Sequence, residues 1–276
     1  LLIAAAPSLL YALNSCSGSG ATFPPPGIDQ ALLDRVLARA LEKGGDFADI
    51  YIENRISRQI VMEESVFRGG LYGVSQGAGI RVISGNKTGY AYTEELTKEK
   101  LLRAAEVASF VARGAEKGVG KPVSVTDRTS YVTVKVPLQQ VADDQRLQIL
   151  KRADEAARDY DRRIKMTSIE YNDEIRSRII ATSEGVYLQD ELPLLFFIVQ
   201  AMSDDGTNRH MARERLSYHS GFEMFETVSP ETVARNAARE AIDMLGAKDA
   251  PAGIMDVVMQ NGWGGVLVHE AVGHPL

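Results

Sequence analysis

The sequence is poor in the residues that build disulfides, nucleic-acid surfaces and membrane spans. It has a single cysteine, Cys16, so no disulfide can form within the chain. Acidic residues outnumber basic ones by 37 to 31 and no basic stripe is present, which argues against nucleic acid as a partner. The uncharged runs at 1–16 and 192–199 are shorter than the roughly 20 residues of a membrane-spanning helix.

What the chain does contain is enough for a folded core. Of its 276 residues 45% are hydrophobic, which supports one large or two ordinary domains. The chain begins at Leu1 rather than at a methionine and ends within a motif. We therefore expect it to be a fragment of a longer protein.

Residues 1–27 are expected to form a signal-like segment and a linker. The mostly apolar stretch 1–16 resembles the hydrophobic region of a secretion signal, and the Ser/Gly stretch and proline run that follow resemble a linker. Leu13-Asn14-Ser15-Cys16 also resembles a bacterial lipobox, in which Cys16 would be lipidated and tether the chain to a membrane. The alternative is a buried amphipathic N-terminal helix, so localisation stays open.

Residues 28–137 have the pattern of an N-terminal α+β domain. Asp29 is a candidate cap for a first helix, and a second helix is expected at 97–113. Between them the hydrophobic period changes to two, which predicts a meander of short antiparallel strands. Turns are expected at Gly69-Gly70 and Gly85-Asn86. A further strand is expected at 130–137.

Residues 138–250 repeat the order helix, strands, helix as a middle α+β domain. The first helix is expected at 138–160, and the strand run that follows includes the apolar stretch 192–199. Ser229 and Pro230 are typical of the start of the closing helix. Clustered strands favour an α+β fold of antiparallel meanders with flanking helices over a βαβ fold.

Residues 251–276 are expected to start a C-terminal domain, with a short strand at MDVVMQN and then a helix carrying HExxxH. His269 and His274 flank Glu270 in the manner of a zinc-peptidase helix, but five residues apart correspond to about 140° around an α-helix. Gly273 and Pro275 are therefore expected to end the helix and leave His274 just past it. Apolar residues around His269 predict that the helix is buried.

Spacing alone leaves two interpretations of these histidines open, a metal site or hydrogen-bonded core residues. A catalytic zinc site also needs a third protein ligand. His210 and His219 are an odd number of residues apart in a predicted strand, so they are not expected to be ligands. Cys16 lies in the signal-like segment, and the third ligand is expected downstream of Leu276.

Three stretches resemble one known family. GWGGVLVHEAVGHPL, at 262–276, closely resembles the metal-binding segment of the TldD-type subunit of the TldD/PmbA (TldE) metallopeptidases, also called modulators of DNA gyrase. GAGIRVISGNKTGYAYTEEL, at 77–96, resembles another block of that family, and ATSEGVYLQDELPL, at 181–194, resembles its middle region. The resemblance covers about residues 28–276.

The resemblance implies a zinc-dependent peptidase in which His269 and His274 bind Zn²⁺ and Glu270 is the general base. It implies a cysteine from the C-terminal region as third ligand, so the fragment alone is expected to be inactive. It also implies a partner, a TldE/PmbA-like subunit without HExxxH, and a shared chamber that admits unfolded peptides. The family is usually cytoplasmic, whereas residues 1–16 suggest export.

Two other functions are weighed against a peptidase. A non-catalytic peptide-binding or scaffold subunit, tethered through Cys16, would have no use for the carboxylate of Glu270. A DNA-associated regulator is disfavoured by the net charge of −6. The glycines between 69 and 79 are not followed by GK[ST] or a helix, so they indicate turns and bulges rather than a phosphate loop.

Overall fold

The computed structural model describes residues 24, 27–112, 120–125, 132–262 and 264–276. The chain divides into two units, Leu1–Leu245 and Gly246–Leu276. Cys16 and the rest of the signal-like segment lie outside the described residues. Within the described ranges, no helix combines the length and the apolar character needed to span a membrane.

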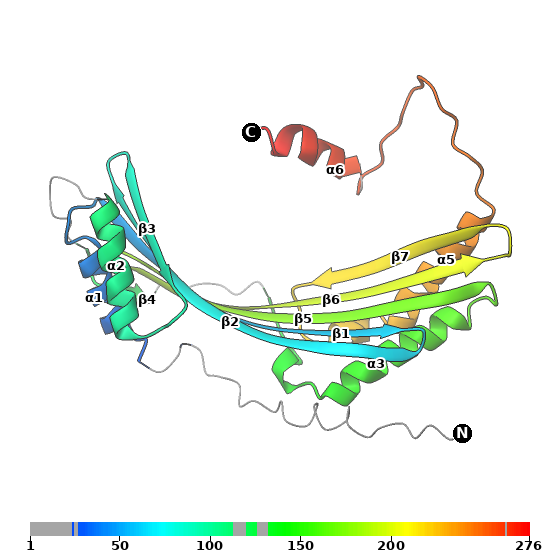
Figure 1. Cartoon of the computed structure of the whole chain (residues 1–276), viewed down its shortest axis with the longest axis horizontal. Helices are drawn as coiled ribbons and strands as arrows, with labels where there is room; N and C mark the ends of the chain where they lie inside the picture. Colours follow the sequence, from blue (N-terminus) through cyan, green and yellow to red (C-terminus); the bar gives the residue numbers. More distant parts are fainter. Residues whose placement is uncertain (1–23, 25–26, 113–119, 126–131, 263) are drawn as a thin grey trace, which may run out of the picture. The chain divides into compact units, whose positions relative to one another are not determined.

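The first unit is built on one sheet of long strands (Figure 1). Its main path runs β3-β2-β1-β5-β6, and β7 also pairs with β6. Every neighbouring pair is antiparallel except the two-residue β4, which lies parallel to β6. The predicted α+β class with antiparallel strands is confirmed. The strands are β1 (Phe47–Glu63), β2 (Val66–Ser84), β3 (Lys87–Thr93), β4 (Ser124–Val125), β5 (Ile164–Thr182), β6 (Val186–Asp204) and β7 (Arg209–Tyr218).

Two pairs of helices cover the sheet, one pair toward each end (Figure 1). Both pairs lie on the same face, because Ile52 and Met62 of β1 point to the same side and pack beneath different pairs. We call the opposite side, where Tyr51 and Arg55 are exposed, the open face. The helices are α1 (Gln30–Ala40), α2 (Lys98–Ala112), α3 (Asp143–Arg158), the short α4 (Met224–Thr227) and α5 (Pro230–Leu245).

The long strands contribute to two hydrophobic cores. Under α1 and α2 the core contains Ile52 of β1 and Ile179 of β5. Under α3 and α5 it contains Met62 and Tyr171 from the other ends of the same strands. The two α+β portions therefore share a single sheet, and their boundary at residue 137 stays a prediction.

Charged residues near the middle of β5 are accommodated by ion pairs, which is why the strand does not break there. Asp173 is buried and accepts hydrogen bonds from Arg146 Nε (3.1 Å) and the Tyr171 hydroxyl (2.8 Å). Glu174, on the open face, accepts from Arg55 Nε at 2.6 Å. The sequence pattern predicts separate strands at 162–173 and 174–184, and the single strand β5 replaces them because the polar residues at their junction have partners within the protein.

The turn between β1 and β2 is also not where the glycines predict it. Gly69 and Gly70 lie inside β2, and the hairpin turns instead at Glu64 and Ser65. Both turn residues have positive φ, 50° and 63°, which two-residue hairpins often require. The Glu64 amide donates to the Thr167 carbonyl of β5 (3.0 Å). This contact with a neighbouring strand stabilises a positive φ at Glu64, which glycine adopts more easily than other residues.

Two predicted strands, at 130–137 and 255–261, are not part of the sheet in the described residues. In 132–137, the Val136 carbonyl instead accepts from the Phe222 amide (2.9 Å). The chain then forms a 3₁₀ turn, η1 (Leu138–Gln140), ahead of α3 rather than one helix over 138–160. The described residues 255–261 are exposed and pair with no strand.

Other local predictions are confirmed. Asp29 caps α1 by accepting from the Leu32 amide at 2.7 Å. Ser229 accepts from the Thr232 amide at 3.2 Å ahead of Pro230. Gly85 has a φ of 56° in the turn between β2 and β3. These features are local in sequence, so the chain itself specifies them.

Replacing Gly89 by alanine is expected to destabilise the first unit by about 1–3 kcal/mol, because overpacking a tight contact forces backbone shifts. Helix α2 packs onto β3 at Gly89, and a Cβ there would overlap the Ala108 carbonyl oxygen and approach the Ala112 nitrogen to 2.8 Å. The matched control is Gly70→Ala, whose Cβ would meet only the Gln59 carbonyl at an ordinary 3.5 Å. Denaturant unfolding that gave equal midpoints for the two variants would contradict the prediction.

Candidate metal centre

The candidate metal centre lies on one helical segment of the second unit. Helix α6 (Gly264–Val268) runs directly into a single π-turn, η2 (His269–Gly273). The His274 amide donates to the His269 carbonyl at 3.1 Å, an i to i+5 hydrogen bond. Such a bond places residues five apart one above the other, as an α-helix does for residues four apart.

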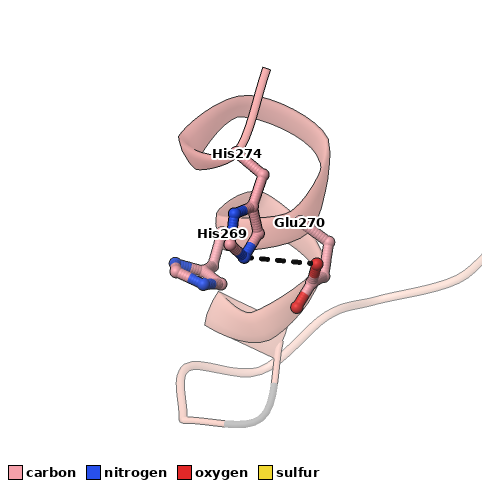
Figure 2. A group of neighbouring side chains, drawn as sticks. All are labelled: His269, Glu270 and His274. Carbon is pink, nitrogen blue, oxygen red and sulfur yellow. Dashed lines mark ion pairs between the residues drawn. The ribbon is translucent and has the colours of Figure 1, made fainter. Parts of the chain in front are cut away.

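The π-turn therefore explains the five-residue spacing of the two histidines. Their ring centroids lie 4.5 Å apart and the ring planes meet at 72° (Figure 2). The helical segment ends at Gly273 with His274 directly after it, as predicted. His274 nevertheless keeps a right-handed conformation (φ −76°, ψ −35°) and Gly273 has no positive φ, so the two rings meet through the π-turn, which was not predicted.

Glu270 completes a group of three potential donors. Its Oε2 lies 3.8 Å from His274 Nε2, drawn as the dashed line in Figure 2. One ligand atom from each of His269, Glu270 and His274 lies within 4.8 Å of the others. Two imidazoles beside one carboxylate suit zinc, whereas magnesium and calcium favour sites made only of oxygen ligands.

The helix that carries these residues is exposed in its unit, contrary to the prediction of a buried helix. Val266, Leu267, Val268 and Val272 are each between 43% and 57% exposed. The described residues of Gly246–Leu276 include none that is buried. A segment of this length cannot surround an apolar helix with a core of its own.

The other two histidines lie in the first unit, at β7. His219 Nδ1 is 3.0 Å from the Pro193 carbonyl oxygen, which occupies one ring nitrogen. His210 lies within β7, where its own carbonyl accepts from the Ser203 hydroxyl at 3.4 Å. Among the residues the structure describes, only His269, Glu270 and His274 form a cluster of three metal-ligating side chains. That neither His210 nor His219 is a ligand stays a prediction.

The feature that sequence analysis missed at this site is the π-turn itself. Its signal was present, because an odd spacing within an otherwise regular apolar helix is what one inserted residue produces. Single π-turns inside α-helices occur frequently at functional sites. That the last turn is a π-turn depends on the backbone hydrogen bond from the His274 amide to the His269 carbonyl, which spacing does not reveal.

Comparison with known families supports the assignment of the first unit. The model of the PmbA/TldA metallopeptidase domain 1 matches residues 48–112, and that of the central domain matches residues 136–245. The metalloprotease TldD homolog of Haemophilus influenzae is 30% identical over 243 residues, covering 84% of this chain and 49% of that protein. The zinc metalloprotease TldD homolog of Saccharolobus solfataricus is 25% identical, covering 87% and 52%.

Solved structures show the same fold. A putative modulator of DNA gyrase from Thermotoga maritima superposes with a TM-score of 0.65 at 22% identity, covering 81% of this chain and 50% of its own. TldE from Thermococcus kodakarensis gives 0.58 at 15% identity, covering 76% and 47%. The chain thus spans about half the length of the relatives it matches. Since the two family models together match more than half of the chain, it belongs to the TldD/PmbA metallopeptidase family.

Proposed function

We propose that the full-length protein is a zinc-dependent peptidase subunit of the TldD type, acting on unfolded peptides or small proteins. The observation that carries the proposal is the π-turn that brings His269 and His274 together beside Glu270. The names of curated relatives, metalloprotease and zinc metalloprotease, support it.

The residues of the segment divide into two roles. His269 and His274 would hold zinc through neutral imidazole nitrogens. When bound, zinc supplies Lewis acidity and lowers the pKa of water. Glu270 is placed to accept the proton of the attacking water and then to donate it to the leaving amine. Its side chain is 61% exposed in this unit, so the carboxylate can exchange protons with solvent.

Two histidines do not make a complete catalytic site, since such sites use three protein ligands. We propose that the third is the cysteine implied by the family resemblance, from a part of the protein beyond residue 276. We also propose a TldE/PmbA-like partner, with the two subunits enclosing a chamber for extended substrates. The likeness to TldE supports this arrangement.

Metal analysis of the full-length protein tests the proposal. Mass spectrometry is expected to find about one zinc per chain, because a site of this kind holds one ion. His269→Ala and His274→Ala should each lose the zinc. His219→Ala is the matched control, because this histidine bonds the Pro193 carbonyl in the other unit, and it should keep the zinc.

The same measurement decides in favour of the second candidate function if no metal is found. A non-catalytic peptide-binding subunit would leave Glu270 and His274 as an exposed side-chain pair. Full-length protein without zinc, or zinc retained in His269→Ala, would contradict the peptidase proposal.

A further inference from the structure

A pocket of about 290 Å³ lies in the first unit, where β1, β2 and β3 meet. It belongs to the open face, because Tyr51 and Glu53 alternate with the core residues Ile50 and Ile52 along β1. Its lining is aromatic, acidic and small: Tyr51, Glu53, Ser75, Gln76, Gly77, Ala78, Gly79, Tyr90, Tyr92, Thr93 and Glu94.

The strand register arranges four of these side chains in two rows. Tyr51 and Tyr92 are both paired with Gly79, so two aromatic residues flank one glycine. Two residues along, Glu53 is paired with Gly77, and the Glu94 Cα lies 3.9 Å from where a Gly77 Cβ would be. One row thus has a tyrosine on each side of Gly79, and the other has a glutamate on each side of Gly77.

The third tyrosine explains why a glycine is needed at the centre. A Cβ on Gly79 would overlap the Tyr90 hydroxyl and come within 3.1 Å of its ring. Tyr90 and Tyr92 are 59% and 73% exposed, so their rings remain accessible to a ligand. The glycine therefore provides the space in which Tyr90 lies across the strand.

The charge of the pocket is negative. No lysine, arginine or histidine is among the described residues that line it. The Glu53 carboxylate accepts a hydrogen bond from the Tyr51 hydroxyl (2.5 Å), and Arg176, whose Nε is 3.7 Å away, offsets part of its charge. The Glu94 carboxylate has no hydrogen bond or ion pair within the described part of the chain. Burial and the adjacent Glu53 raise the pKa of Tyr51 to about 12, so it stays neutral.

An open strand edge leads into the pocket. Strand β3 pairs with β2 only from Ala78 onward, so residues 66–77 of β2 have β1 as their one described neighbour. This stretch is exposed on both faces, including Leu71 and Val74, and Arg68 is its one charged residue. Such an edge accepts an extended chain as an added strand. A chain added there would lie in line with β3 and end beside Glu94.

We infer that this pocket binds the guanidinium or ammonium group of an arginine or lysine side chain, carried by an extended peptide that lies along the edge of β2. Tyr51, Tyr90 and Tyr92 offer ring faces to the cation, and Glu94 offers a carboxylate. The site is remote in sequence from His269, and its binding needs no metal.

The test measures binding of a fluorescein-labelled peptide, Gly-Thr-Arg-Thr-Gly with both ends blocked, to the full-length Glu270→Gln protein by fluorescence anisotropy. Replacing arginine by neutral citrulline, of the same shape, should weaken binding about tenfold. Glu94→Gln in the protein should weaken binding of the arginine peptide about fivefold or more. The matched control is Glu95→Gln, because Glu95 pairs with Lys100 (2.9 Å) and does not line the pocket.

Three results would overturn the inference: no binding of the arginine peptide, equal binding of the citrulline peptide, or Glu94→Gln behaving like Glu95→Gln. Blocked arginine alone competing as well as the peptide would overturn the role of the β2 edge. Metal chelation should leave the binding unchanged. A full-length protein that contains no zinc or hydrolyses no peptide would therefore contradict the proposed peptidase, but it would leave the inferred binding site untouched.

Discussion

Replacing Glu270 by glutamine is expected to lower kcat for peptide hydrolysis by about 10²–10⁴-fold while zinc stays bound, because glutamine cannot accept a proton. The residue lies beside His274 on the same helical segment, so the substitution leaves both imidazoles in place. The measurement is the hydrolysis rate of an unstructured peptide by the full-length protein with its partner subunit. Zinc content is determined on the same samples.

Two further variants serve as controls for this measurement. His269→Ala should lose zinc and activity together, which separates metal binding from proton transfer. Glu226→Gln alters an exposed glutamate on the short helix α4 and should change neither quantity. If Glu270→Gln hydrolysed peptide at the wild-type rate, Glu270 would not be the general base.

Replacing Asp173 by alanine is expected to reduce the free energy of unfolding of the first unit by about 3 kcal/mol, the lower end of the range for breaking a buried ion pair, because the buried guanidinium of Arg146 keeps only the half-exposed carboxylate of Asp143 at 3.0 Å. Arg146 is 1% exposed and bonds Asp173 Oδ2 at 3.1 Å. Its other nitrogens donate to the carbonyls of Leu138 and Val141, both at 2.6 Å, so it cannot turn toward water without breaking them. Denaturant unfolding measures the change.

The double variant Arg146→Met/Asp173→Leu distinguishes a buried charge from a lost contact. Removing both charges together should restore part of the stability, since an apolar pair of similar size needs no partner, and the buried Tyr171 hydroxyl, which loses its acceptor, limits the recovery. Arg68→Ala is the surface control: its pair with Glu63 is about half-exposed, and less than about 1 kcal/mol is expected. An Asp173→Ala effect no larger than that of Arg68→Ala would contradict the prediction.

The metal centre shows how far residue spacing can be taken. The sequence predicted that His269 and His274 meet beside Glu270, and in the structure the three side chains lie together. The predicted helix end at Gly273 is also where the helical segment ends. The π-turn before it was not predicted, because a plain helix end and a π-turn can both follow from the same spacing. The prediction that the helix is buried was wrong. Burial depends on what packs against the apolar residues, and none of the described residues of Gly246–Leu276 is buried.

The α+β class, the positions of α1, α2 and α5, and the caps Asp29 and Ser229 followed from the sequence itself. Each depends on residues a few positions apart, through helical periodicity, alternation or a capping oxygen. Tertiary structure alone decided the continuity of β5 through Asp173, since Arg146 comes from α3. It also decided the turn at Glu64, held by Thr167 of β5. The pocket of Tyr51 and Glu94 depends on it most, because these residues meet only through the register of three strands, and such distant pairings have no local signal.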